Sequence, residues 1–143
     1  MQLICFGLNH KTAPVAVREQ FAIPKSAVRQ GLANLGDYDG VNEAVVLSTC
    51  NRSEIYAVVE SAADDFASLK QFFFDLAGNE EDIDAYLYTY MDEDCVRHLF
   101  RVAASLDSLV LGEGQILSQV KEAYAIAREA GTTSTVLNTL FHR

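Results

Sequence analysis

The stretch AVVLSTCNRSEIYAVV, residues 44–59, decides how this chain folds. Residues 43–47 and 55–60 are rich in strand-forming side chains, and a short polar segment separates them, which is the pattern of a β-hairpin. Cys50 is expected at the tip of this hairpin, where a rigid sheet can present a thiol to a substrate. Arg52 follows two residues later, and a neighbouring cation favours the thiolate, the reactive form of cysteine. From these residues alone, a nucleophile and a small polar turn residue are equally open interpretations of Cys50.

The segments on either side of the hairpin predict an α+β fold. Strand-like runs and helical periodicity alternate in the order β, α, β, β, α, β, and further helices follow. The expected strands are 3–8, 43–47, 55–60 and 86–90, and the expected helices are 12–21, 26–35, 62–77, 92–106, 113–130 and 135–143. Thr12 and Asp92 are expected to cap the helices that they begin, and Gly36, Gly78 and Gly131 to end the helices before them. This order predicts a ferredoxin-like split βαβ sheet, mainly antiparallel with helices on one face, followed by C-terminal helices.

The composition is that of one ordinary globular domain. The chain has 143 residues, half of them apolar, which is enough for a sizeable core. No apolar run approaches the ~20 residues of a membrane span, and the N-terminal residues lack the basic segment of a signal peptide. We therefore expect a cytoplasmic protein without a membrane contact. The three cysteines form no C-x-x-C pair and have no zinc-type spacing, so we expect no metal site and place Cys5 and Cys95 in the core.

The chain is strongly acidic. Its net charge is −9, with 20 acidic against 11 basic side chains. Because neutralising phosphates requires basic surface, this balance disfavours general nucleic-acid binding. Lys11, Arg18, Lys25 and Arg29 form a basic series with Glu19 as the only acid among them. Contact with RNA and, as the more common case, a solvated helical face are both open interpretations of this series.

His98 is a candidate site residue because of its place on helix 92–106. The apolar face of that helix centres near Val96, Leu99 and Ala103, and His98 falls roughly 140° from this centre at about 100° per residue. We therefore expect His98 outside the core, either in solvent or in a cleft.

Two glutamines on the next helix are further candidates. Gln115 and Gln119 are four residues apart, so both project from one helix face. The preceding Gly112-Glu113-Gly114 begins like a dinucleotide-binding motif, but Leu117 stands where the last glycine belongs, and the sequence contains no P-loop. No nucleotide site is expected from these residues.

Three separated peptides, NHKTAP (9–14), STCNR (48–52) and SLDSLVLGEGQILSQVK (105–121), are informative as a set because of their order and spacing. The set resembles the N-terminal catalytic domain of the glutamyl-tRNA reductase family, and the resemblance extends over essentially all of the chain. The NADPH-binding and dimerisation domains of that family have no counterpart in this sequence, so we expect them to be absent from it.

The resemblance implies an NADPH-dependent oxidoreductase that makes the first precursor of tetrapyrroles, including porphyrins and haem. A thiolate attacks the ester carbonyl of glutamyl-tRNA, the tRNA leaves, and hydride from NADPH releases glutamate-1-semialdehyde from the thioester. By position, Cys50 matches the nucleophile of the family and His98 matches its important histidine. The residues that match its glutamate-binding set are Thr49, Asn51, Arg52, Ser108, Glu113, Gly114, Gln115 and Gln119.

The resemblance also implies partners and shows two departures. The full-length enzyme is expected to be a homodimer that docks with glutamate-1-semialdehyde aminotransferase, and no metal is expected. This domain alone is expected to form the thioester at most, without making the aldehyde. Gly114 stands where the family usually has proline, and Ser118 where it usually has glycine. Glycine leaves the first helical turn looser than proline does, which bears on how the two glutamines are positioned.

Two functions of other classes stay open. A Cys-dependent acyl transferase or esterase would act on small glutamyl esters and be indifferent to tRNA. A non-catalytic binding module of the same fold would keep its ligand after Cys50→Ser and never form an acyl intermediate. A binding module needs no nucleophile, which favours an enzyme.

Overall fold

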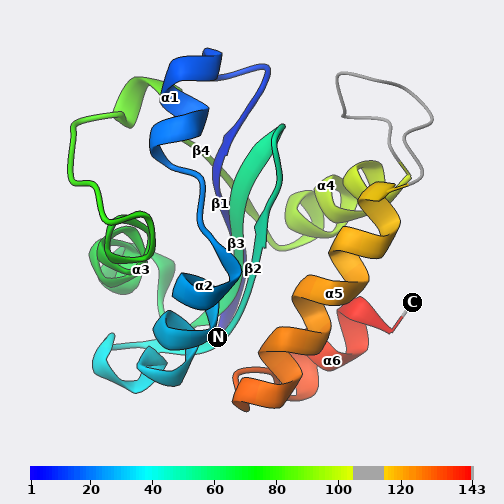
Figure 1. Cartoon of the computed structure of the whole chain (residues 1–143). Helices are drawn as coiled ribbons and strands as arrows, with labels where there is room; N and C mark the ends of the chain where they lie inside the picture. The colour runs from blue at the N-terminus through cyan, green and yellow to red at the C-terminus, as the bar shows by residue number, and fades with distance from the viewer. Residues whose placement is uncertain (105–114, 143) are drawn as a thin grey trace.

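The computed structural model describes residues 1–104 and 115–142, and its core is one four-stranded sheet (Figure 1). The strands are β1 (Gln2–Asn9), β2 (Val41–Ser48), β3 (Arg52–Val59) and β4 (Tyr88–Met91). The α-helices are α1 (Val15–Gln20), α2 (Lys25–Ala33), α3 (Ala62–Ala77), α4 (Glu93–Ala103), α5 (Gln115–Ala130) and α6 (Thr135–Phe141). Two short 3-10 helices, η1 (Leu35–Asp37) and η2 (Asp84–Tyr86), precede β2 and β4.

The sheet has the strand order β2-β3-β1-β4, and every neighbouring pair is antiparallel. This is the order of a ferredoxin-like split βαβ sheet, so the expected fold class is confirmed. The hairpin of β2 and β3 is confirmed as well, with Ser48 opposite Ser53 at its turn. At the same end of the sheet, Asn9 at the end of β1 lies opposite Arg52 at the start of β3. The Cys50 turn and the β1–α1 connection are therefore neighbours.

Helices cover both faces of the sheet (Figure 1). On one face, Phe6 of β1 packs edge-on against Phe66 and Phe73 of α3, with ring centroids 5.3 and 5.4 Å apart. On the other, Tyr56 of β3 packs against Phe141 of α6 at 5.7 Å. Successive strand residues point to opposite faces, so β3 can serve both cores at once. The C-terminal helices thus form the second layer of the domain.

Close approach of β1 and β3 requires a glycine in β1. A Cβ atom added to Gly7 would lie 2.1 Å from the backbone oxygen of Ser53 and 2.8 Å from the Cα of Glu54. A residue larger than glycine at position 7 would therefore push β1 away from β3. Glu54 lies directly opposite Gly7 in this close pairing.

The expected helix stops at Gly78 and Gly131 are confirmed, whereas the two expected caps are wrong. Both glycines have left-handed φ values, 66° and 75°, which favour glycine after a helix. Thr12 does not cap α1: its hydroxyl accepts a hydrogen bond from the Asn9 N–H (3.1 Å), and Pro14 precedes the helix. Asp92 precedes α4, but its carboxylate accepts a bond from the Leu3 N–H of the neighbouring strand (3.3 Å) instead of capping.

Other differences concern element ends. Helix α1 ends at Gln20 and α2 ends at Ala33. The expected helix stop at Gly36 is wrong, because Asn34 caps α2 and Gly36 lies inside η1. Strand β4 begins two residues later than expected, since η2 includes Tyr86. The C-terminal end expected for helix 92–106 and the first residues expected for helix 113–130 lie outside the described residues. In the described ranges, no helix combines the length and apolar character needed to cross a bilayer.

Candidate active site

Cys50 is presented to solvent by a hydrogen-bonded turn between β2 and β3. The backbone N–H of Thr49 donates to the Arg52 carbonyl oxygen (2.8 Å), and the N–H of Asn51 donates to the Thr49 hydroxyl (3.1 Å). These bonds close the turn with Cys50 exposed, while Cys5 and Cys95 are fully buried. Of the three thiols, Cys50 is therefore the one that a substrate can reach, as expected from the sequence. The core positions expected for the other two are confirmed.

Helix α1 forms the other wall of a cavity of about 340 Å³ that includes Thr49, Cys50 and Asn51. Arg18 of α1 lines this cavity, and its Nη1 donates to the Cys50 carbonyl oxygen (3.3 Å). From the sequence, Arg18 was only a member of a basic series. Arg18 and Cys50 are 32 residues apart in the chain, so no local sequence pattern indicated this contact.

Arg52 is buried in the sheet and does not belong to the surface of the turn. It is 1% exposed, and its Nη1 lies 3.6 Å from Oε1 of Glu54, which is itself 0% exposed. Residues i and i+2 of a strand share a face, so β3 itself brings the cation and the carboxylate together. In the structure the guanidinium faces the buried carboxylate of Glu54, so its charge is shared between this contact and the nearby Cys50 turn.

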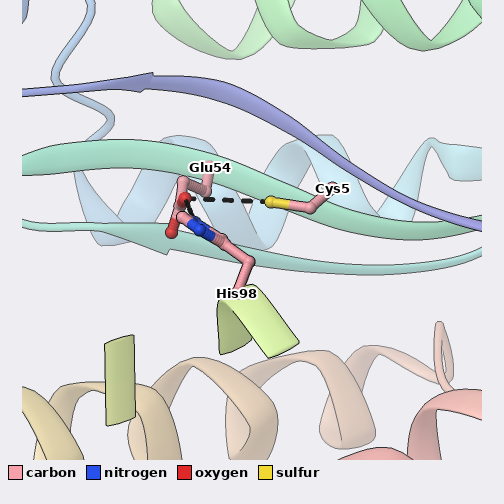
Figure 2. Close-up of side chains that lie close together, drawn as sticks. All are labelled: Cys5, Glu54 and His98. Atoms are coloured by element: carbon pink, nitrogen blue, oxygen red, sulfur yellow. Dashed lines mark hydrogen bonds and ion pairs between the residues drawn. The ribbon is translucent and has the colours of Figure 1, made fainter. Parts of the chain in front are cut away.

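Glu54 accepts hydrogen bonds from four further side chains, and Figure 2 shows two of these donors, Cys5 and His98. Its Oε1 accepts from the Tyr56 hydroxyl (3.1 Å). Its Oε2 accepts from Tyr88 and from Nε2 of His98, and the Cys5 thiol donates to the same oxygen at 3.7 Å. We call Glu54 and the side chains that contact it the Glu54 cluster. An ionised carboxylate only accepts hydrogen bonds, so His98 carries its proton on Nε2 in this contact.

The protonation states of the cluster follow from its contacts. Burial raises the pKa of Glu54, but the hydrogen bond and charge of His98, the charge of Arg52 and the bond from Tyr88 outweigh it and hold the pKa below its usual 4.5. Glu54 is therefore a carboxylate at neutral pH. Burial, reinforced by the charge of Glu54, raises the pKa of Cys5, Tyr56 and Tyr88 well above their usual values. These groups stay protonated and act as donors.

His98 is buried, so the expectation that it lies outside the core is wrong. It is 5% exposed, and its ring stacks on Tyr90 with centroids 4.5 Å apart and planes 24° from parallel. Helical periodicity misplaced this residue because it assigns only apolar side chains to the core. It cannot show that a buried carboxylate of the sheet, Glu54, forms a hydrogen bond with His98. The missed signal was Glu54, an acidic residue within an apolar strand run. The ring also borders a cavity of about 490 Å³, which agrees with the alternative of a cleft position.

Cys5, Glu54 and His98 have the residue types of a metal site, and their ligand atoms all lie within 4.8 Å of one another. The surroundings fit a hydrogen-bonded network better than a cation. Both Glu54 oxygens already accept hydrogen bonds, and the Arg52 guanidinium lies 3.6 Å from one of them. A positive ion would face that guanidinium at close range. We therefore derive no chemistry through a metal here.

Two of the remaining predicted site residues, Gln115 and Gln119, belong to the described part of the chain. Gln119 of α5 is half-buried and lines a small cavity with Ser48, the residue before Thr49. Gln115, the first described residue of α5, is exposed. The structure thus brings Gln119 near the turn that carries Cys50. Ser108, Glu113 and Gly114 lie outside the described residues.

A sequence model described as "Glutamyl-tRNAGlu reductase, N-terminal domain" matches residues 6–143. The chain belongs to this family. The glutamyl-tRNA reductase of Methylococcus capsulatus is 44% identical over the whole chain, which covers 34% of that protein, and glutamyl-tRNA reductase 2 of Koribacter versatilis is 50% identical over the whole chain, which covers 32%. The chain therefore spans about a third of the length of the curated relatives that it matches.

A solved structure supports the same assignment. Glutamyl-tRNA reductase from Methanopyrus kandleri superposes with a TM-score of 0.76 at 33% identity, over 98% of this chain and 31% of that one. The sheet and helices described above are therefore the fold of the N-terminal domain of glutamyl-tRNA reductases.

Proposed function

We propose that this chain is the acyl-transfer domain of a glutamyl-tRNA reductase, which reduces glutamyl-tRNA to glutamate-1-semialdehyde through a Cys50 thioester in the first step of tetrapyrrole synthesis. One observation carries the proposal. Cys50 is exposed on a hydrogen-bonded turn at the end of the sheet where Arg52 and His98 also lie, whereas the other two cysteines are fully buried.

The acyl transfer balances with the groups of this chain. The Cys50 sulfur attacks the ester carbonyl carbon, a C–S bond forms, and the C–O bond to the terminal ribose breaks. The thiol proton leaves with the tRNA hydroxyl. His98 is the candidate for moving it, because it borders the cavity beside Asn9, and Asn9 lies opposite Arg52 at the Cys50 end of the sheet.

Substrate binding would use the residues that match the family's glutamate-binding set. A guanidinium pairs with a carboxylate through two parallel hydrogen bonds, so Arg52 is the proposed partner of a glutamate carboxylate. Because Arg52 is buried against Glu54, this pairing would require the substrate to enter the sheet edge beside that contact. Thr49, Asn51 and Gln119 surround the same end of the sheet. Ser108, Glu113, Gly114 and Gln115 complete the proposed set.

NADPH would supply the hydride that converts the thioester into the aldehyde. The sheet of this chain is antiparallel throughout and offers no parallel βαβ unit of a dinucleotide-binding fold within the described residues, so we derive no hydride step from them. For the full-length enzyme we propose NADPH-binding and dimerisation domains beyond these residues, a homodimer, a cytoplasmic location, and docking with glutamate-1-semialdehyde aminotransferase.

The test is to mix the chain with glutamyl-tRNA, quench in acid and measure the intact mass. We expect a glutamyl adduct on Cys50 that is missing in Cys50→Ser and present in Cys95→Ala, which removes a buried thiol instead. Accelerated release of free glutamate without an adduct would mean that hydrolysis outruns trapping. The catalytic assignment is wrong if neither adduct nor release occurs with this chain and the same holds for a longer chain that carries the further domains.

The same samples separate the two other functions. An adduct from a small glutamyl ester, formed as fast as from glutamyl-tRNA, would indicate a general Cys-dependent acyl transferase or esterase. Unchanged binding of glutamate by Cys50→Ser, together with no adduct in the original chain, would indicate a non-catalytic binding module.

A further inference from the structure

A cavity of about 490 Å³ opens between the segment that follows β1 and helix α4, next to His98. This volume is within the ~300–1,000 Å³ of ligand-binding clefts in proteins. Its wall carries three cationic side chains, Lys11 from the segment after β1 and Arg97 and Arg101 from α4, against one acid, Asp94. The chain as a whole has a net charge of −9, so this cavity is positive on an otherwise acidic protein.

The two arginines are four residues apart on one helix face. Like charges at this spacing repel each other and destabilise a helix. Arg97 has acidic neighbours, with Asp94 at 3.6 Å and Glu93 at 3.9 Å, but all three side chains are largely exposed. Ion pairs between such exposed groups contribute little and exchange readily with other ligands. A bound anion would therefore relieve the repulsion between the two arginines without breaking a strong contact.

The segment that carries Lys11 is ordered by its own hydrogen bonds. Oδ1 of Asn9 accepts from the Lys11 N–H (2.9 Å), and the Asn9 carbonyl oxygen accepts from the N–H groups of Thr12 (3.1 Å) and Ala13 (2.9 Å). Asn9 is itself only 3% exposed. This hydrogen-bonded turn holds the Lys11 backbone at the edge of the cavity, so the position of the lysine is fixed by the turn.

The cavity is adjacent to the reactive turn. Asn9 lies opposite Arg52 in the sheet, and Arg52 follows Cys50 by two residues. Neighbouring strands are about 4.8 Å apart, so a ligand over Asn9 is one strand away from the segment that carries the nucleophile. His98 belongs both to this cavity and to the Glu54 cluster.

We propose that this cavity binds phosphodiester groups at the aminoacylated end of the substrate RNA, with Lys11, Arg97 and Arg101 supplying the positive charge. The inference rests on the proposed function and adds the place where the RNA backbone is held. Of the basic series in the sequence, Lys11 lines this cavity, whereas Arg18 lines the cavity at Cys50 and Lys25 the cavity beside Gln119. The proposed tRNA contact therefore consists of Lys11 and the two arginines of α4, without the rest of the basic series.

The test is to measure the Kd of the chain for tRNA as a function of salt concentration, by fluorescence anisotropy. The double variant Arg97→Gln/Arg101→Gln is expected to weaken binding and to reduce the slope of log K against log salt by about 0.7–0.9 for each phosphate that is no longer neutralised. The matched control, Lys121→Gln/Arg128→Gln, removes the same charge from exposed positions of α5 and is expected to keep the slope. The weakening should be the same for tRNAs of different sequence, because phosphate contacts carry no base information.

Two results would overturn the inference: equal slopes for the double variant and the control, or no salt-dependent RNA binding by the original chain. Acylation of Cys50 by a small glutamyl ester, measured on the original chain, separates these failures from failure of the proposed function. If Cys50 is acylated and the slopes are equal, the cavity assignment alone falls. If Cys50 is not acylated by either substrate, the proposed function falls with it.

Discussion

Replacing Glu54 with glutamine is expected to destabilise the fold by about 3–5 kcal/mol. The change keeps the shape of the side chain, removes the charge that faces the buried Arg52, and turns an NH₂ group toward groups that are themselves donors. Removing one partner of a buried ion pair costs about 3–5 kcal/mol, because the other charge stays buried and uncompensated. The bonds from Tyr56, Tyr88 and Cys5 are not added to this figure, since contacts within one network are not additive.

The assay is urea and thermal unfolding followed by circular dichroism. For a domain of this size a loss of 3–5 kcal/mol corresponds to a fall of Tm by about 10–20 °C. Glu60→Gln is the matched control: Glu60 directly follows β3, is exposed and bonds only the Asn42 amide (2.8 Å) among the side-chain contacts described, so its loss should cost less than about 0.5 kcal/mol. The double variant Arg52→Met/Glu54→Gln should recover part of the stability, because it no longer buries an unpaired cation.

The pH dependence checks the same reasoning. The pKa of Glu54 is lowered on folding, so its contribution to stability is complete above about pH 4.5 and is lost as the pH falls through the folded value. The difference in unfolding free energy between the original chain and Glu54→Gln should therefore be constant near neutral pH and shrink below 4.5. A variant with the original Tm, or a difference that does not change between about pH 7 and pH 3, would refute the account of Glu54 as an ionised, fully paired carboxylate.

Two further predictions concern the strand contact and the thiols. Gly7→Ala should lower the free energy of unfolding in urea by about 2–3 kcal/mol, because its Cβ would lie 2.1 Å from the Ser53 oxygen. The control Gly36→Ala, with nothing within 4 Å of its Cβ, should cost far less. Equal unfolding midpoints for the two variants would contradict the close approach of β1 and β3. Brief iodoacetamide treatment of the folded chain should label Cys50 alone, as mass spectrometry of peptides would show, and labelling of the other two cysteines before unfolding would contradict their burial.

Much of the fold could be predicted because its signals are local. The two apolar runs around Cys50 form β2 and β3, the periodic segment 62–77 forms α3, and Gly78 ends it in a left-handed conformation. Each depends on residues a few positions apart. The same holds for the exposed thiol, which only requires a turn between two strands. The expected cap at Asp92 failed for the opposite reason, since its carboxylate accepts a hydrogen bond from Leu3, 89 residues away in the chain. Thr12 instead accepts from Asn9, three residues earlier, in the turn after β1.

The family could be predicted from the sequence, but the arrangement of the candidate site could not. The three peptides 9–14, 48–52 and 105–121 indicated the family, and the comparisons confirmed it. No pattern in the sequence indicated that Arg18 contacts the Cys50 turn, 32 residues away. Nor could any pattern show that Lys11 and the α4 arginines line one cavity, because they belong to segments that meet only in the folded chain.

By itself, the sequence determined the order of the strands and helices and the exposed position of Cys50, because periodicity and turn chemistry act over a few residues. The tertiary structure alone decided that His98 is buried and that Glu54 accepts its hydrogen bond. His98 and Glu54 are 44 residues apart in the chain, and no local rule connects them. A polar side chain such as His98 becomes a core residue only when folding supplies its hydrogen-bond partner, and here that partner comes from another element of the fold.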